Sequence, residues 1–192
     1  MNFYSDVIIN DIIDHAPMDE LMDTVHRFIN ECKYVLTKYS GTSIHHKYTS
    51  NVLNDPRKIV AFYCLDREFA MSNCPSAMMY RKCHHKIKNT DTKEMPSEIR
   101  YYVLFTCTKR SFRGQGYASK MFDGFLERVR EEKQKHPNHV IKVILSSLES
   151  SVLFYESYGF KWTRKCISEY PVLMEYEAYE EGKEYFMMEL IV

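Results

Sequence analysis

The stretch that decides the fold reads Thr106-Cys-Thr-Lys-Arg-Ser-Phe-Arg-Gly-Gln-Gly-Tyr-Ala-Ser-Lys120. The run from Tyr101 to Thr108 is rich in β-branched and aromatic residues, which predicts a strand. Beyond the glycines, apolar residues recur at steps of three and four, which predicts a helix with one buried face. These residues are Ala118, Met121, Phe122, Phe125, Leu126 and Val129. We therefore expect a strand, a tight turn and a helix in direct succession.

The turn over residues 113–118 indicates an anion-binding site. Gly114 and Gly116 are small enough for the backbone to approach a ligand closely. The first amides of a helix lack an intrahelical partner and carry a partial positive charge, so they are suited to a pyrophosphate. Arg113, together with Lys109 or Arg110, would add positive charge.

Two known phosphate-binding patterns do not fit this turn, and another interpretation needs no ligand. A dinucleotide fingerprint requires a third glycine after a first strand, whereas this turn has two glycines and lies past mid-chain. A P-loop requires a Gly-Lys pair followed by Ser or Thr, and that pattern does not occur. An ordinary strand, turn and helix with two convenient glycines stays open on the turn alone.

Two motifs resemble the GNAT superfamily of acetyl-coenzyme A dependent N-acyltransferases. Arg113, Gly116 and Ala118 match the family's pyrophosphate loop, which has Arg or Gln, then Gly three residues later, then Gly or Ala. Ser151-Val-Leu-Phe-Tyr-Glu-Ser-Tyr-Gly-Phe160 is similar to the family's helix motif and follows a strand-like run over 140–146. The resemblance implies a mixed, mainly antiparallel sheet flanked by helices. We expect one such domain over residues 1–192.

The activity that the resemblance implies is direct transfer of an acetyl group from acetyl-CoA, the co-substrate, to a primary amine. The residues implied to bind acetyl-CoA lie in the strand, the turn and the end of the following strand. They are Thr106, Cys107, Thr108, Arg113, Gly114, Gln115, Gly116, Tyr117, Ala118, Ser119 and Ser147. Strand amides around Thr106 to Thr108 would stabilise the oxyanion. Tyr155 matches the family position whose hydroxyl protonates the leaving thiolate, and a phenol of pKa about 10 nearly balances that transfer.

The sequence does not identify the general base. The Tyr101 to Thr108 strand contains no acid, so Glu98 before it and Glu149 after the next strand are the candidates. Leu148 stands where the family frequently has an asparagine, and Ser147 beside it is the nearest substitute. The alternative function is therefore a CoA-binding regulatory or scaffold module of the same fold that has lost turnover.

Composition excludes several other classes of function. Among 192 residues, 26 Lys and Arg balance 26 Asp and Glu, so no overall charge favours nucleic acid or an anionic membrane as a partner. A small-molecule or protein amine is the expected acceptor. Six cysteines without a C-x-x-C pair, and no signal or membrane-spanning stretch, predict a cytoplasmic protein with reduced thiols. The 15 tyrosines and 11 methionines leave a homodimer open.

Other segments carry weaker patterns. We expect strands over 7–9, 58–65, 77–83, 160–170 and 184–192 and a helix over 18–36. We also expect a loop over 88–94 and a loop over 39–56, where a short helix is the alternative. Ser146-Ser-Leu-Glu149 has the form of a capping box that would begin the next helix, and Gly159 fits a left-handed cap at its end. The acidic run from Glu175 to Glu181 is either an exposed loop or a wall of the acceptor pocket that attracts a cationic amine.

A zinc site at Cys74, Cys83, His84 and His85 is the remaining alternative, because thiolate and imidazole are suitable ligands. Their spacing fits no common zinc site. We therefore expect no metal.

Overall fold

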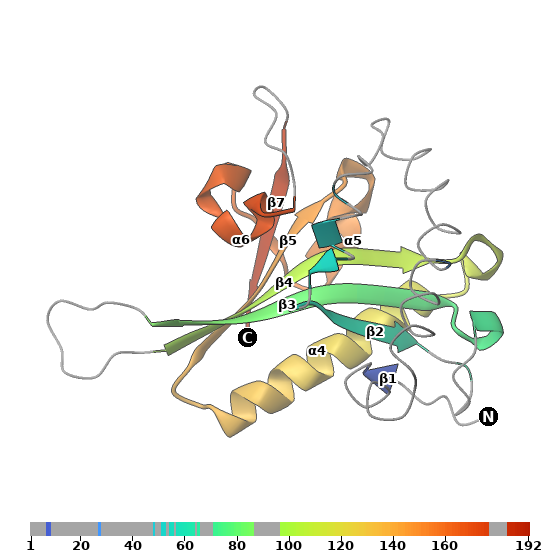
Figure 1. Cartoon of the computed structure of the whole chain (residues 1–192), viewed down its shortest axis with the longest axis horizontal. Coiled ribbons are helices and arrows are strands. Elements are labelled where there is room, and N and C mark those ends of the chain that lie inside the picture. The colour runs from blue at the N-terminus through green and yellow to red at the C-terminus, as the bar shows by residue number, and fades with distance from the viewer. Residues whose placement is uncertain are drawn as a thin grey trace, which may run out of the picture.

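Strand β4, Ser97–Thr108, is the centre of the sheet because its apolar residues are buried on both faces. It pairs antiparallel with β3 on one side and parallel with β5 on the other. The full strand order is β1-β2-β3-β4-β5-β7-β6, and every described pair except β4 with β5 is antiparallel. The predicted fold class, a mixed and mainly antiparallel sheet flanked by helices, is confirmed (Figure 1).

The computed structural model describes residues 7–8, 27, 48, 51–52, 54–55, 57–63, 65, 71–86, 97–176 and 184–192. The strands other than β4 are β1 Val7–Ile8, β2 Ile59–Tyr63, β3 Ser76–Lys86, β5 Val140–Ser147, β6 Lys161–Trp162 and β7 Phe186–Ile191. The α-helices are α4 Tyr117–Lys135, α5 Val152–Ser157 and α6 Pro171–Met174. The short 3-10 helices are η1 Met71–Asn73, η2 Arg110–Phe112, η3 Glu149–Ser151 and η4 Ile167–Glu169.

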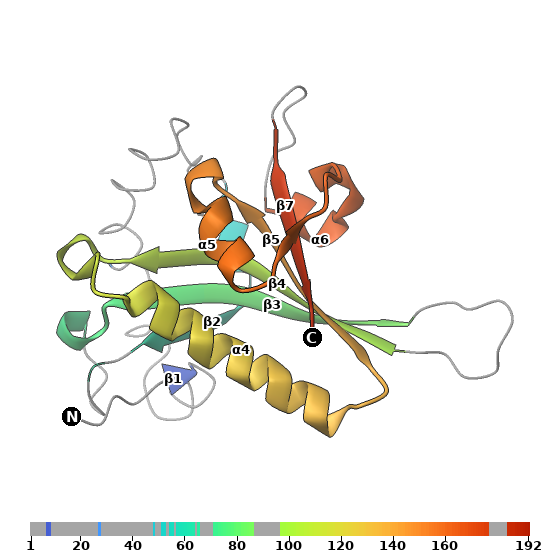
Figure 2. The ribbon, with the colours of Figure 1, turned by 180° about the vertical axis from the view of Figure 1, so that it is seen from behind.

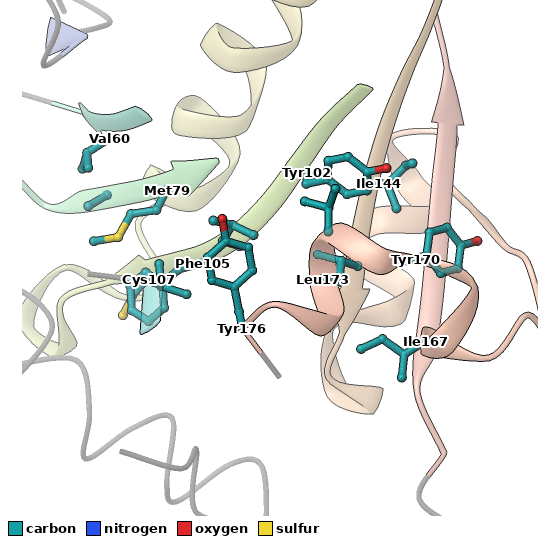
Figure 3. Close-up of a cluster of buried hydrophobic side chains, with 14 of the residues drawn as sticks. Val60, Met79, Tyr102, Phe105, Cys107, Ile144, Ile167, Tyr170, Leu173 and Tyr176 are labelled. Atoms are coloured by element: carbon teal, nitrogen blue, oxygen red, sulfur yellow. The ribbon is translucent and has the colours of Figure 1, made fainter. Parts of the chain in front are cut away.

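The two faces of the sheet carry separate buried clusters. Helices α4 and α5 cover one face (Figure 2). The predicted apolar residues of α4 from Met121 to Val129 are buried, whereas Ala118 is only half-buried. Helix α6, η4 and the helical residues around Val52 cover the other face, where they pack on Tyr102, Phe105 and Cys107 (Figure 3). Because each face has its own covering layer, side chains of β4 alternate between two different surroundings.

Most of the predicted elements are confirmed. Strands form within 7–9, 58–65 and 184–192, the strands around 77–83 and 140–146 extend further than predicted, and α4 ends at Lys135 just before Pro137. Gly159 has a φ of 89° and closes α5 as a left-handed residue. The predicted helix over 18–36 and the loop over 88–94 lie outside the described residues, apart from Arg27, which has helical backbone.

The predicted strand over 160–170 is wrong beyond β6. Arg164 has a φ of 57°, which interrupts the extended backbone. Cys166 and Glu169 then form a capping box at η4, and Pro171 begins α6, where a missing amide proton costs nothing. The segment turns back over the sheet instead of continuing along it.

The predicted capping box at Ser146 to Glu149 is also wrong. Ser146 is committed to β5, where it pairs with Met187 of β7. Leu148 precedes η3 and provides no side-chain cap. Pairing with β7 therefore keeps Ser146 in the sheet, although the local sequence pattern predicted a helix cap at this residue.

Within the part of the chain that the structure describes, no helix has both the length and the apolar character that crossing a membrane requires.

Candidate active site

Strands β4 and β5 separate near the middle of the sheet. Their last paired residues are Val103 and Leu145, yet β4 continues to Thr108 and β5 to Ser147. The register between β3 and β4 skips Leu104, which is a bulge, and bulges bend a strand. The two arrows visibly diverge from this point (Figure 1). The edge of β4 from Leu104 to Thr108 therefore has no described strand beside it on the β5 side.

The turn before α4 presents a row of amides. After η2, the amides of Phe112 and Arg113 bond back into the turn, and the Lys120 amide makes the first helical bond, to the Gly116 carbonyl at 3.0 Å. Across the fully described range 97–176, the six amides of residues 114–119 donate no hydrogen bond of normal geometry within the protein. They sit at the amino end of a 19-residue helix, where its dipole adds partial positive charge.

The two glycines of the turn are required by backbone conformation. Gly114 has a φ of 74° and Gly116 a φ of 76°, values that L side chains rarely adopt. A Cβ at either position would meet nothing within 4 Å, so the space beside the amides is open. The sequence interpretation that small residues are needed here holds, but the need comes from φ, and the open space is available to a ligand.

The basic residues of this turn differ in their solvent exposure and in their hydrogen bonds. Arg113 donates from Nε to the Thr108 carbonyl at 3.1 Å, which ties the turn to the end of β4. Lys109 is only 4% exposed, so it is not presented to solvent as the sequence suggested, whereas Arg110 is exposed. Gln115 is exposed and donates to the Ser111 carbonyl.

Tyr117 anchors the first turn of α4 with its ring. The ring packs between Tyr63 and Phe112, with centroid distances of 5.7 and 5.8 Å. Lys120 Nζ lies 5.0 Å from the same ring, which places a cation beside the amides of residues 114–119. Ser119 uses its carbonyl to accept a hydrogen bond from Tyr158, which follows α5.

Tyr155 of α5 lies on the face of the sheet that carries α4. Its ring packs against Phe122 at 5.5 Å, Phe154 at 5.2 Å and Phe160 at 5.8 Å. Burial raises the pKa of the Tyr155 phenol to about 12, and the neighbouring Thr106 hydroxyl opposes part of that rise. The expected pKa near 10 is therefore wrong, because the sequence does not show this aromatic enclosure.

Thr106 joins Tyr155 to the separated part of β4. Its Oγ1 is buried and makes no hydrogen bond of normal geometry. Buried polar atoms are nearly always satisfied, and the polar group that interacts with the Thr106 hydroxyl here is the Tyr155 phenol. Thr108 is satisfied by Ser76 at 2.7 Å, and Cys107 is buried on the opposite face.

Ser147 ends β5 across the gap from this edge. It is 8% exposed, and its Oγ donates to the Leu148 carbonyl at 2.8 Å. The structure thus brings together, around the separation of the two strands, the turn, Thr106, Ser147 and Tyr155.

Of the two acids considered as the base, Glu98 is held away from this site, and Glu149 lies two residues after Ser147. Glu98 lies at the opposite end of β4, where Arg100 and Lys142 approach its carboxylate to 2.8 and 3.0 Å. Burial opposes ionisation, but these hydrogen bonds lower the pKa of Glu98. Glu149 is exposed in the first position of η3.

The structure also contains a polar cluster that sequence reasoning missed. It consists of Asp55, Arg57, Arg81, Glu175 and Tyr176, and it is called the arginine–carboxylate cluster below. Asp55 is 6% exposed and Tyr176 is 3% exposed, although both lie in segments that read as polar loops. No local pattern reveals the cluster, because its members come from three separate segments.

The described residues contain no group of three His, Cys, Asp or Glu side chains that could hold a metal ion. Cys74 and Cys83 are free thiols.

A comparison with protein families adds to this geometry. Residues 92–170 match the model of the acetyltransferase (GNAT) domain family, a range that includes β4, the turn, α4, β5 and α5. These residues resemble a GNAT domain, in agreement with the family that the two sequence motifs indicated. The match supports acetyl transfer in general terms. No curated protein matches the sequence.

Solved structures resemble the GNAT domain and its surroundings in fold. Tetrahymena GCN5 is 8% identical with a TM-score of 0.50, and the match covers 86% of this chain and 87% of that chain. Arabidopsis thaliana Naa50, solved with the bisubstrate analogue CoA-Ac-MVNAL, is 16% identical with a TM-score of 0.49, covering 97% and 99%. At such identities the likeness to GCN5 concerns the fold alone.

Proposed function

We propose that the protein is an acetyl-CoA dependent N-acetyltransferase that transfers the acetyl group to a primary amine by direct attack. The observation that carries this proposal is the row of six unbonded amides at residues 114–119, beside the separation of β4 and β5. A diphosphate offers acceptor oxygens to several amides at once, and the helix dipole favours its negative charge. Arg113 and Lys120 add charge at the same place.

The separated strand edge supports binding of an extended carrier. Pantetheine contains amides that can pair with a free strand edge, as an added strand would. Among the described residues, the edge from Leu104 to Thr108 has no strand partner on the β5 side, and Thr106 Oγ1 makes no hydrogen bond of normal geometry. Both features fit a ligand that brings its own donors and acceptors.

Acetyl transfer to an amine requires three contributions from the protein. An alkyl ammonium has a pKa of about 10.4, so the acceptor must lose a proton before it attacks the thioester. An amide of β4 between Thr106 and Thr108 would stabilise the developing oxyanion. Tyr155 would then donate a proton toward the departing sulfur, and its raised pKa keeps the phenol protonated at neutral pH.

A second candidate function is a CoA-binding module without turnover. It is favoured by the position of Glu98, which is held in ion pairs away from the strand separation. Such a module would bind coenzyme A through the same amides but would not need Tyr155.

Thiol release from acetyl-CoA separates the two functions. The assay would use a panel of primary amines that includes a polyamine, an aminosugar and a lysine-containing peptide, with coenzyme A binding measured by calorimetry. Amine-dependent release supports the transferase. Binding without amine-dependent release would favour the module, and absence of binding would contradict both.

A further inference from the structure

The arginine–carboxylate cluster joins three segments by short ion pairs. Glu175 Oε2 lies 2.6 Å from Arg57 Nη2 and 2.7 Å from Arg81 Nη1, so one carboxylate oxygen bridges two guanidinium groups. Arg57 also binds Asp55 through Nε at 2.8 Å. Tyr176 donates its phenolic proton to Asp55, and Arg81 donates to the Tyr176 hydroxyl at 3.3 Å.

This cluster borders the strand separation on the face opposite Tyr155. Arg81 of β3 pairs across the sheet with Tyr102, which immediately precedes the last residue of β4 that pairs with β5. Tyr176 packs in the same buried cluster as Phe105 and Cys107, which belong to the separated part of β4 (Figure 3). Tyr155 and α5 belong to the cluster on the other face.

Tyr48 and Asn51 form hydrogen bonds to the same elements. Tyr48 donates its hydroxyl proton to the Leu104 carbonyl, at the bulge itself. Asn51, three residues later, donates from Nδ2 to the Tyr176 carbonyl at 3.3 Å. The segment ending at Tyr176 is therefore held against the separated edge of β4 from two directions.

These two faces have different roles if acetyl-CoA is bound as proposed. The carrier occupies the side with the turn, Thr106 and Tyr155, so the amine has to approach the thioester carbon from the side with Tyr48 and Tyr176. An amine attacks productively only when its nitrogen is held close to that carbon in the correct direction. The wall on that side therefore needs a fixed position.

We propose that Glu175 is a positioning residue for the acceptor: by bridging Arg57 and Arg81 it holds the Glu175–Tyr176 segment against β3 and β4 as a wall of the acceptor site. This proposal rests on the proposed transferase function. It also revises the interpretation of Glu175 as an acid that attracts a cationic amine, because both arginines already neutralise its carboxylate. Its action on the acceptor is geometric.

The test compares Glu175→Gln with the wild-type full-length chain. The Glu175 side chain is 41% exposed, so the substitution removes the charge without opening a buried cavity. Glu131→Gln is the matched control, since Glu131 is exposed on α4 and belongs to neither site. Thiol release would be measured with the best amine of the panel and with hydroxylamine, a nucleophile too small to need the wall.

We expect Glu175→Gln to raise the KM for the amine roughly tenfold, with little change in kcat, in the rate with hydroxylamine or in the Kd for coenzyme A. Arg81→Gln should give a similar change, and the double variant should be less than additive because both single variants remove the same ion pair. Glu131→Gln should behave as wild type.

Two results would overturn the positioning role: an unchanged KM for the amine, or an equal loss with hydroxylamine and the amine, which indicates general damage to the fold. Failure of the proposed transferase function looks different. In that case the wild-type protein itself releases no thiol above the uncatalysed rate with any amine or with hydroxylamine, and the positioning role falls with it.

Discussion

Phe122 of α4 packs edge-on against Tyr155 of α5, with ring centroids 5.5 Å apart. Phe122 is fully buried one turn after the amides of residues 114–119, and it also contacts Tyr158 at 5.1 Å. One ring therefore fixes the distance between the proposed phosphate-binding turn and the proposed acid. A ligand held at one end would present its other end to Tyr155 only if this contact is kept.

Replacing Phe122 with Leu should slow acetyl transfer more than it weakens coenzyme A binding. The smaller side chain loses several aromatic contacts, so we expect a loss of about 1 to 3 kcal/mol in the free energy of unfolding. We also expect kcat to fall more than coenzyme A affinity, as measured by steady-state thiol release and calorimetry. Phe125→Leu is the control, because Phe125 is buried on the same helix and stacks on Tyr80 and Tyr101. Equal falls in kcat for both variants would contradict the role of Phe122.

Replacing Tyr155 with Phe should lower kcat by roughly 10²-fold, the usual value of general acid help, and leave the Kd for coenzyme A unchanged. Tyr158→Phe is the comparison for losing one phenol beside the same Phe122 ring, and it removes only the hydrogen bond from Tyr158 to the Ser119 carbonyl. Rapid-mix measurements of thiol release would ensure that chemistry limits the rate. Full turnover by Tyr155→Phe under those conditions would exclude its role as an acid.

Replacing Asp55 with Asn should destabilise the protein in a pH-dependent way. Burial alone would raise the pKa of Asp55, but hydrogen bonds from Arg57 and Tyr176 hold it well below its usual range. A carboxylate with a lowered pKa stabilises the fold above its unfolded pKa of about 3.9, and this contribution is lost as the pH falls below that value.

For Asp55→Asn we expect the free energy of unfolding at neutral pH to be about 2 kcal/mol lower than that of the wild-type protein. This difference should shrink as the pH falls below about 4. Urea unfolding at a series of pH values would measure it. Asp123→Asn, at an exposed position of α4, should show no deficit. A deficit for Asp55→Asn that stays constant with pH would mean that its charge is not the stabilising feature.

Replacing Gly116 with Ala should weaken coenzyme A binding. The φ of 76° strains any L side chain by roughly 1 to 2 kcal/mol, so the turn would shift and misalign its amides. We expect the Kd from calorimetry to rise about tenfold or more. Gly159→Ala is the matched control, because its φ of 89° imposes a similar strain at the end of α5. If both variants bind coenzyme A as well as wild type, the turn is not the binding site.

The sequence predicted those elements whose pattern is local and strong. The strand before Thr108, the turn with Gly116 and the helix through Val129 all have continuous signals, and all three form. The predictions failed where a distant partner decides the conformation. Ser146 has the form of a helix cap, but pairing with Met187 keeps it in the sheet.

The features of the candidate site also fall into those that local sequence predicts and those that depend on distant contacts. The amides of the turn follow from the two glycines and the helix start, so sequence could locate them. The raised pKa of Tyr155 depends on Phe122 and Phe160, and the pairing of Glu175 depends on Arg57 and Arg81. These contacts join segments far apart in the chain, and no spacing in a single segment reveals them.

Nuclear magnetic resonance of the ¹⁵N-labelled protein tests the central claim most directly. Coenzyme A and pantetheine, which lacks the diphosphate, would be titrated separately while the amide signals of residues 114–119 are followed. We predict that coenzyme A shifts these signals and that pantetheine leaves them nearly unchanged. Amide signals at 114–119 that do not respond to saturating coenzyme A would contradict the claim.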